Sequence, residues 1–335
     1  RGRGPDGIGL SVAVVDPGTL AGRDVRAILR ERSFPSAHVH LFHTTDPGSG
    51  LLTEDEGEAA FVSALAPDGL EGCQIAFLCG APEATAAFLA SRTADGCLAI
   101  DLSGQRASGA FIDALRGEIP SPLPAGDLFV LRHPAATVLA DAVAAVDALQ
   151  SVAAVTAAID RPASDLGKDS LDELFQQAIA IASFRSVPKD QLGAQSAFNV
   201  YSPADTDAFD ARVAADFRAL LGRELPLCIL SARAGVFHGT TLRVELRFDG
   251  PAPDAGALRS ALLSTGRGFA EPDVDGPAGI VDAAGRDDTL VLRSTSGGAA
   301  ARLFLASDDL RRPGALLAVR LAEAVVAERG LLPDA

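Results

Sequence analysis

A helix start directly behind an apolar strand is the place in this chain where a nucleophile could do chemistry. The apolar run 128–131 is followed by Pro134, and the alanine-rich segment after this proline is typical of a helix. The dipole at a helix N-terminus stabilises a thiolate. The positions that would carry the sulfur are Ala135 and Ala136. The pattern therefore predicts the frame of an enzyme site whose reactive atom is missing.

Composition restricts the class of protein. A chain of 335 residues predicts two domains, and a net charge of −15 argues against binding to nucleic acids or anionic membranes. No apolar run is long enough to span a membrane. The four cysteines lack the spacing of metal ligands, so no metal is expected. They are Cys73, Cys79, Cys97 and Cys228. They are interpreted as reduced thiols of a cytoplasmic protein.

Methionine is absent from the whole sequence. This is unusual for a globular chain of this size. One hypothesis is that methionines were present as a modified residue and were dropped from the sequence, which would leave gaps of one residue. An intact mass that agrees with the printed composition would reject this hypothesis.

Apolar segments alternate with helical segments in the first part of the chain. The expected strands are 10–15, 39–42, 73–79, 97–101 and 128–131. Strands separated by helices predict a Rossmann-type parallel sheet with right-handed crossovers, in which ligands bind beyond the C-terminal strand ends. The turns after Val15, Cys79, Asp101 and Leu131 are therefore expected to line one crevice.

The second part of the chain has the pattern of an α+β domain. Its expected strands are 152–159, 227–231, 242–248 and 289–293, and its expected helices are 168–184, 206–221 and 254–265. Together they predict an open sheet with helices on one face. The expected domains are 1–133, with a C-terminal helix at 315–335 packing back on it, and 134–314.

An ordered set of segments resembles the aspartate-semialdehyde dehydrogenase family, and in particular its cysteine-lacking paralogues. The segments are 14–22, 34–35, 197–200, 233–239, 282–288, 308–311 and 314–316. No single segment is specific, but their order and spacing fit over nearly the whole chain. The resemblance implies a dinucleotide-binding domain, a catalytic and dimerisation domain, and therefore a homodimer.

Family chemistry, as the resemblance implies it, is covalent. A cysteine thiolate attacks the aldehyde, hydride passes to a nicotinamide cofactor, phosphate cleaves the thioester, and a histidine is the acid and base. Ala136 occupies the nucleophile position and Thr240 the histidine position. Neither side chain can do that chemistry. His238 would share a strand face with Thr240 and is a less favoured substitute.

The resemblance implies three substrate-binding candidates. Arg106 matches the phosphate-site arginine if one residue is missing before it, Asp216 stands where the family has a glutamate, and Arg233 matches the substrate arginine. The two arginines favour a dicarboxylate or phosphate as ligand. The alternative is that these are solvated surface charges, which is least plausible for Arg233 on its apolar strand.

The cofactor loop departs from the family pattern. Gly-x-x-Gly-x-x-Gly reads Asp16-x-x-Thr19-x-x-Gly22, with negative charge and bulk where phosphate would approach, although Gly18 could shift the turn. The helix start still offers free N–H groups. Asp46 would repel a 2′-phosphate. NAD is therefore expected to bind weakly at most, and NADP is not expected to bind. The remaining cofactor-site candidates are Gly18, Thr19, Gly22, Gly80, Gly167 and Asp309.

These departures favour a dimeric, non-catalytic paralogue, a pseudoenzyme that binds a dinucleotide or a small acidic ligand. The alternative is an active NAD(P)-dependent, phosphorylating semialdehyde dehydrogenase of amino-acid biosynthesis, whose printed sequence omits a modified residue between Pro134 and Thr137. Four departures are not explained by an omitted residue: Asp16, Thr19, Asp46 and Thr240. A third interpretation is a regulatory protein that senses a dinucleotide or an acidic metabolite.

Overall fold

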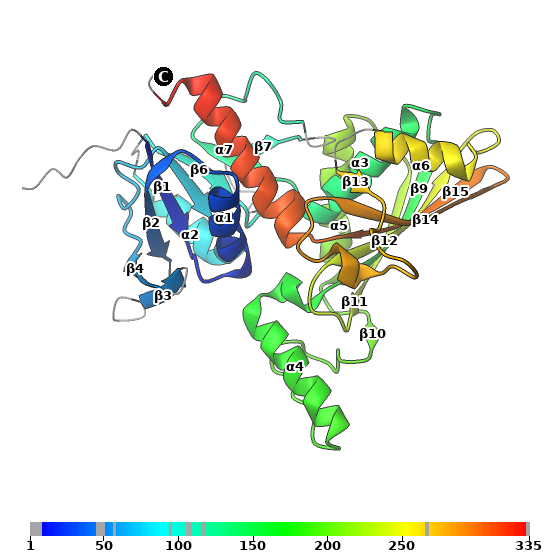
Figure 1. Cartoon of the computed structure of the whole chain (residues 1–335), viewed down its shortest axis with the longest axis horizontal. Helices are drawn as coiled ribbons and strands as arrows, with labels where there is room; N and C mark the ends of the chain where they lie inside the picture. The colour runs from blue at the N-terminus through cyan, green and yellow to red at the C-terminus, as the bar shows by residue number, and fades with distance from the viewer. Residues whose placement is uncertain are drawn as a thin grey trace, which may run out of the picture. The chain divides into compact units, whose positions relative to one another are not determined.

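Two compact units make up the computed structural model, which describes residues 9–44, 51–55, 58–93, 96–104, 109–114, 118–264 and 268–332. Unit 1 comprises Arg1–Asp113, Ile119–Arg132 and Gly314–Ala335, and unit 2 comprises Ala114–Glu118 and His133–Pro313. Each unit is built on its own sheet, coloured blue to cyan in unit 1 and green to orange in unit 2 (Figure 1). Among the described residues, no helix has both the length and the apolar character that crossing a membrane requires.

Unit 1 contains an eight-stranded sheet with the order β3-β4-β2-β1-β5-β6-β8-β7. All neighbours pair in parallel except β3 and β4, which form an antiparallel pair at one edge. The strands are β1 (Leu10–Val15), β2 (Ser36–His43), β3 (Leu51–Asp55), β4 (Glu58–Ala64), β5 (Ile75–Leu78), β6 (Leu98–Asp101), β7 (Ala110–Ile112) and β8 (Leu128–Leu131). The predicted Rossmann-type parallel sheet is therefore confirmed.

The central strands of unit 1 are apolar at successive positions because both of their faces are covered. Val12, Ala13 and Val14 of β1 are 0% exposed, and all residues of β5 are buried. The helices of this unit are α1 (Leu20–Glu31), α2 (Pro82–Ser91) and α7 (Leu316–Arg329). An ion pair between Arg32 and Glu323, at 2.7 Å, joins the C-cap of α1 to α7.

Unit 2 contains a seven-stranded mixed sheet with the order β10-β11-β9-β12-β15-β14-β13. The strands are β9 (Ala154–Arg161), β10 (Val200–Tyr201), β11 (Leu227–Ala234), β12 (Thr240–Arg247), β13 (Phe269–Ala270), β14 (Thr289–Gly297) and β15 (Ala300–Ser307). The helices are α3 (Pro134–Asp147), α4 (Lys168–Ala182), α5 (Thr206–Leu221) and α6 (Ala255–Ser264), with shorter turns η1 (Ala163–Leu166), η2 (Ile280–Ala283) and η3 (Leu310–Ala315).

The core of unit 2 lies between one face of its sheet and the helices α3, α5 and α6. Leu139 of α3, Phe217 of α5 and Leu258 of α6 join Leu242 and Leu305 of the sheet in one buried cluster. Strand residues alternate between the two faces, so Arg243 and Glu245 lie on the other face, which we call the open face. The predicted open sheet with helices on one face is confirmed.

Candidate functional site

The turn after β1 in unit 1 is the first candidate site, because parallel sheets bind ligands beyond their C-terminal strand ends. Asp16 follows β1 directly and adopts a left-handed conformation with φ 57°. Its carboxylate accepts hydrogen bonds from Thr44, through the N–H at 2.9 Å and the hydroxyl at 2.8 Å. Thr44 follows β2, so the side chain of Asp16 bridges two neighbouring strand ends.

Thr19 and Gly22 connect this turn to α1. Thr19 is the N-cap of α1, where its hydroxyl oxygen accepts from the N–H of Gly22 at 3.1 Å. The same hydroxyl lies 2.9 Å from the carbonyl of Asp16 and 3.0 Å from that of Cys79. A Cβ on Gly22 would lie 2.5 Å from the carbonyl oxygen of Asp16, so only glycine fits.

Glycines 18 and 80 have different surroundings in the structure. A Cβ added to Gly18 would meet no atom within 4 Å, so this glycine does not set the conformation of the turn. A Cβ on Gly80, after β5, would lie 2.1 Å from Oδ2 of Asp16. The structure therefore brings Asp16, Thr19, Gly22 and Gly80 together, and the residue with positive φ at the position of the first family glycine is an aspartate.

The start of α3 in unit 2 is the second candidate site. Ala135 and Ala136 are 3% and 0% exposed. His133 caps the helix, since its Nδ1 accepts from the N–H of Ala135 at 3.2 Å, and its own N–H donates to Asp216 at 3.0 Å. Burial, and then the charge of Arg212, lowers the pKa of His133 to about 4. The imidazole is therefore neutral near pH 7 and a weak base.

Asp216 on α5 is 2% exposed and has a structural partner in the N–H of His133. The ring of His133 also packs edge-on against Phe209 of α5, with 4.8 Å between ring centroids. These contacts place Asp216 beside the start of α3, next to Ala135 and Ala136.

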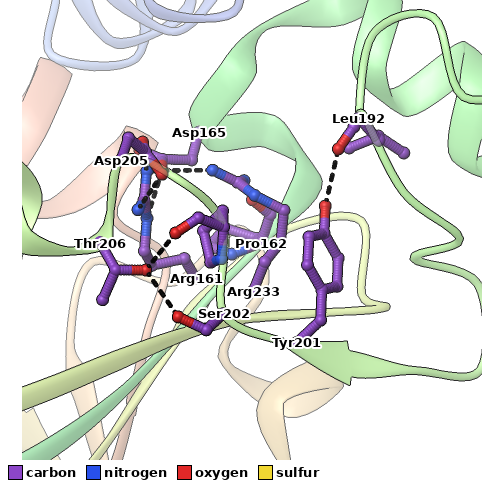
Figure 2. A network of polar contacts seen from close by, with 10 residues as sticks. Arg161, Pro162, Asp165, Leu192, Tyr201, Ser202, Asp205, Thr206 and Arg233 are labelled. Carbon is purple, nitrogen blue, oxygen red and sulfur yellow. Dashed lines mark hydrogen bonds and ion pairs between the residues drawn. The ribbon is translucent and has the colours of Figure 1, made fainter.

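Arg233 lies at the end of β11 in a network of polar contacts (Figure 2). It is 1% exposed, and its guanidinium donates to the carbonyl of Pro162 at 2.7 Å and pairs with Asp165 at 3.4 Å. Arg161 is its register partner on the parallel strand β9. The strand ends therefore place two arginines side by side.

Arg161 is a residue that sequence reasoning missed. It is 3% exposed, binds Asp205 through both nitrogens of its fork at 3.0 and 2.7 Å, and pairs with Asp165 at 2.7 Å. The hydrogen bond from Arg161 lowers the pKa of Asp205. A buried arginine needs a charged partner, so the closeness of Arg161 and Asp165 in the sequence could have indicated this ion pair. The network carries two positive and two negative charges.

Thr240 and Asp309 form the remaining part of the site in unit 2. Thr240 is 5% exposed and begins β12. Burial, followed by the charge of Asp165, raises the pKa of Asp309 to about 7, although a hydrogen bond with Thr240 opposes this shift. Among the described residues, Oδ1 of Asp309 has no hydrogen-bond partner. Gly167 has φ 93° and precedes α4, where it serves the backbone turn after η1.

The expectation that His238 shares a strand face with Thr240 is wrong. β12 begins at Thr240, Gly239 before it has φ 86°, and His238 is exposed in the preceding loop. Arg106 and Asp46 lie outside the described residues. In the part of the chain that the structure describes, no three His, Cys, Asp or Glu side chains form a group that could hold a metal ion.

Known proteins were compared with the chain and its fold. No family model matches the chain. The "USG-1 protein homolog" of Pseudomonas aeruginosa is 28% identical, over 95% of this chain and 98% of its own length. Aspartate-semialdehyde dehydrogenase of Rickettsia conorii is 24% identical, over 94% of this chain and 97% of its own length.

Solved structures share the fold. That of a probable aspartate-semialdehyde dehydrogenase from Pseudomonas aeruginosa has a TM-score of 0.83 at 26% identity, and covers 95% of this chain and 98% of its own. The Candida albicans aspartate-semialdehyde dehydrogenase, solved with NADP, has a TM-score of 0.67 at 12% identity, and covers 96% of this chain and 99% of its own. The relatives and the first of these structures match along nearly the whole chain, so the chain is similar to aspartate-semialdehyde dehydrogenases in both sequence and fold.

Proposed function

We propose that the protein is a non-catalytic member of the family, which acts as a binding or partner protein rather than as a dehydrogenase. The observation that carries the proposal is the start of α3, where Ala135 and Ala136 are buried in place of a nucleophile. A methyl group cannot form the thioester on which the family chemistry depends. Loss of a covalent nucleophile costs several orders of magnitude in rate, on the order of 10⁶ in one protease series.

The other described cysteines do not offer a substitute. Cys79 is buried, and burial together with the charges of Asp16 and Asp101 raises the pKa of its thiol, which keeps it protonated. Cys228 is exposed on β11, whose neighbours Leu227 and Ile229 pack against the helix-covered core. Alternation along the strand therefore puts Cys228 on the open face, away from α3.

General acid–base catalysis lacks a suitable group as well. The hydroxyl group of Thr240 cannot accept and release a proton at neutral pH, because its pKa is far from that range. His133 has a pKa of about 4 and its Nδ1 is occupied by the N–H of Ala135. Asp309, with a pKa of about 7, is the one described group of this site that titrates near neutrality. Without a nucleophile beside it, this carboxyl group has no acyl intermediate to act on.

We propose a small acidic molecule as a ligand of unit 2, because Arg161 and Arg233 are buried together at adjacent strand ends. The arginines already bind Asp165 and Asp205, so a ligand carboxylate would have to displace one of them. Aspartate or inorganic phosphate should therefore raise the melting temperature only when a carboxylate is removed, as in Asp165→Asn. For dinucleotides, we propose weak binding of NAD at most and none of NADP.

A homodimer is the assembly that we propose, with the partner surface on the α4 arm, defined as α4 and the segment 183–199. Figure 1 shows α4 extending away from the sheet of unit 2. Phe184 and Phe198 on this arm are 98% and 78% exposed. Both have positive φ, 55° and 59°, which bulky residues rarely adopt.

Phe184 gives the stronger indication of a partner surface. The N–H groups of Phe184 and Arg185 bond to the carbonyls of Ile181 and Ala180, at 3.2 and 2.8 Å. This is the Schellman pattern, in which the left-handed position is usually glycine. An exposed phenylalanine there costs backbone strain of roughly 1 kcal/mol and gains no burial within the chain. A second copy that covers the ring would explain why it is present.

Phe184→Gly tests the dimer, because it removes the ring and relieves the backbone. Light scattering coupled to size exclusion should give twice the chain mass of 34.3 kDa for the natural protein. The dissociation constant of the dimer should be at least about tenfold higher for the variant than for the natural protein. The melting temperature of the monomeric variant should not be lower, because glycine relieves the backbone strain. Phe61→Ser, at a 66% exposed position on β4, is the matched control and should remain dimeric. A natural chain that is monomeric at all concentrations would contradict the dimer.

The proposed loss of catalysis is tested by phosphate-dependent oxidation of aspartate semialdehyde with NADP. No turnover is expected from the natural protein or from Ala136→Cys, since a restored thiol would still lack the histidine. Turnover at ordinary enzyme rates would reject the proposal. Sequencing the coding region and mapping the peptide across Pro134 to Thr137 tests the alternative, an active dehydrogenase with an omitted residue. The buried cysteines Cys73, Cys79 and Cys97 form no disulfide, which fits the proposed cytoplasmic location.

A further inference from the structure

A carboxylate of the chain itself stands where a Rossmann-type unit receives the phosphates of a dinucleotide. Asp16 lies between the end of β1 and the start of α1, the turn that approaches a pyrophosphate in such folds. Its N–H donates to the carbonyl of Phe42 at 2.7 Å, and each carboxylate oxygen accepts a hydrogen bond from Thr44. The side chain is therefore fixed at both ends of its carboxyl group and is not free to swing into solvent.

The carboxylate also lies against the next strand end. A Cβ on Gly80 would come within 2.1 Å of Oδ2 of Asp16, and the next side-chain oxygen, that of Thr85, would be 3.5 Å away. Gly80 follows β5, which pairs with β1 on the side opposite to β2. One carboxylate thus spans the ends of three adjacent strands, which is the crevice a ligand would enter.

Thr19 binds one of the N–H groups at the start of α1. The start of a helix can bind an anion because its first N–H groups have no partner inside the helix. Here the hydroxyl of Thr19 accepts from the N–H of Gly22 and contacts the carbonyl oxygens of Asp16 and Cys79. The N–H of Gly22 is therefore already bound to a protein oxygen, and the carboxylate of Asp16 adds a negative charge to the turn.

We propose that Asp16 and Thr19 form an internal seal that closes the strand-end site of unit 1 to dinucleotide phosphates. Asp16 supplies the anion that a phosphate would otherwise supply, and an incoming phosphate would meet a like charge held in place. The groups present therefore do not fit a dinucleotide. The inference concerns unit 1 alone and does not depend on the loss of the nucleophile in unit 2.

The seal is tested by titrating NADH and NADPH into the full-length protein and its variants, followed by calorimetry. The natural protein should show no saturable binding. Asp16→Asn keeps the shape and tolerates positive φ, but lacks the charge, so it should gain measurable affinity. Asp16→Gly with Thr19→Gly restores space and free N–H groups and should bind at least about tenfold more tightly than Asp16→Asn. Asp68→Asn, an exposed position in the same unit, changes the net charge equally and should not bind.

Two results would overturn the seal. One is saturable binding of either dinucleotide by the natural protein, with an affinity equal to that of the double variant. The other is a double variant that keeps its native circular dichroism and does not bind. If the double variant does not fold, Asp16→Asn decides the question, with a gain of binding for the seal and no gain against it. Binding by the natural protein without turnover would reject the seal while leaving the proposed loss of catalysis intact.

Discussion

Burial favours the neutral form of two side chains in unit 2 and therefore shifts their pKa values in opposite directions. It lowers the pKa of His133 to about 4, which keeps the imidazole neutral, and it raises the pKa of Asp309 to about 7, which brings a carboxyl group into the neutral range. The negative charge of Asp165 raises both pKa values, so it adds to the shift of Asp309 and opposes that of His133. The site therefore has a weak base where a strong one would be needed, and a carboxylic acid that is half protonated near pH 7.

Asp309→Asn should change how stability depends on pH. The pKa of Asp309 in the folded state is about 7 against an ordinary value of 3.8, so the folded state holds the proton more tightly. This stabilisation is fully present below about pH 4 and is lost as pH rises through about 7. Relative to the neutral asparagine, the natural protein should lose free energy of unfolding between about pH 4 and 7, by about 1.4 kcal/mol per pH unit at most.

Urea unfolding of both proteins at several pH values measures this difference. Asp249→Asn, on an exposed turn after β12, is the control and should run parallel to the natural protein. Parallel stability curves for Asp309→Asn and the natural protein between about pH 4 and 7 would mean that Asp309 is ionised as in an ordinary surface position.

Residue identities at the site could be predicted from the sequence, but their contacts could not. Ala136 and Thr240 were identified by alignment with the family pattern, since position along the chain is enough. The pairing of Arg233 with Asp165, and the bridge from Asp16 to Thr44, depend on segments 68 and 28 residues away. Positive φ at Asp16 likewise follows from the close packing of Gly22 on that turn.

At the scale of elements, the β1–α1 unit has kept what packing requires. Gly22 must remain glycine, because any Cβ would overlap the carbonyl of Asp16 and Cα of Pro17, at 2.5 and 2.8 Å. The position of the first family glycine has instead become Asp16, which tolerates a left-handed conformation better than most residues. The glycine that packs the helix against the strand is thus retained, while Asp16 stands at the position of the turn glycine and Thr19 at that of the glycine that lets phosphate approach.

Gly80→Ala tests how closely β1 and β5 are joined by Asp16. In the natural background the new methyl group would overlap the carboxylate, so a loss of about 1–3 kcal/mol in free energy of unfolding is expected. In an Asp16→Gly background the loss should nearly disappear. Denaturant unfolding of the four proteins gives the coupling energy.

Gly18→Ala is the matched control for this cycle, since its methyl group would meet no atom within 4 Å. It should be nearly neutral in both backgrounds. A coupling energy below about 0.5 kcal/mol between Gly80→Ala and Asp16→Gly would show that the carboxylate does not lie against β5.

The elements themselves were largely predictable where apolar runs are long. All five strands expected in the parallel sheet, and all four expected in the second sheet, are present. β15 was missed although it is central, because its alanines weaken the strand pattern. Gly297 and Gly298 before it are a hairpin signal that would have found it. β3 and β4 were missed because their charged residues interrupt the alternation.

For the whole molecule, both units have complete sheets and buried cores, and under the proposed function each lacks a group that the family reaction needs. Unit 1 has a carboxylate at the phosphate turn, and unit 2 has alanine at the nucleophile position. Burial of Ala136 and the bonding of Asp16 make each change compatible with a well-packed fold. Under the proposed function, the fold is retained for binding and assembly without the family chemistry.

Single-turnover oxidation of aspartate semialdehyde measures whether the protein retains the family chemistry. Protein in excess over substrate is mixed with NADP and phosphate, and reduced cofactor is followed by absorbance, with an active family enzyme as the positive control. The account predicts no reduced cofactor above the protein-free rate, on a timescale at least about 10⁴ times longer than the control requires. Formation of one equivalent of reduced cofactor per substrate at a rate near that of the control would contradict it.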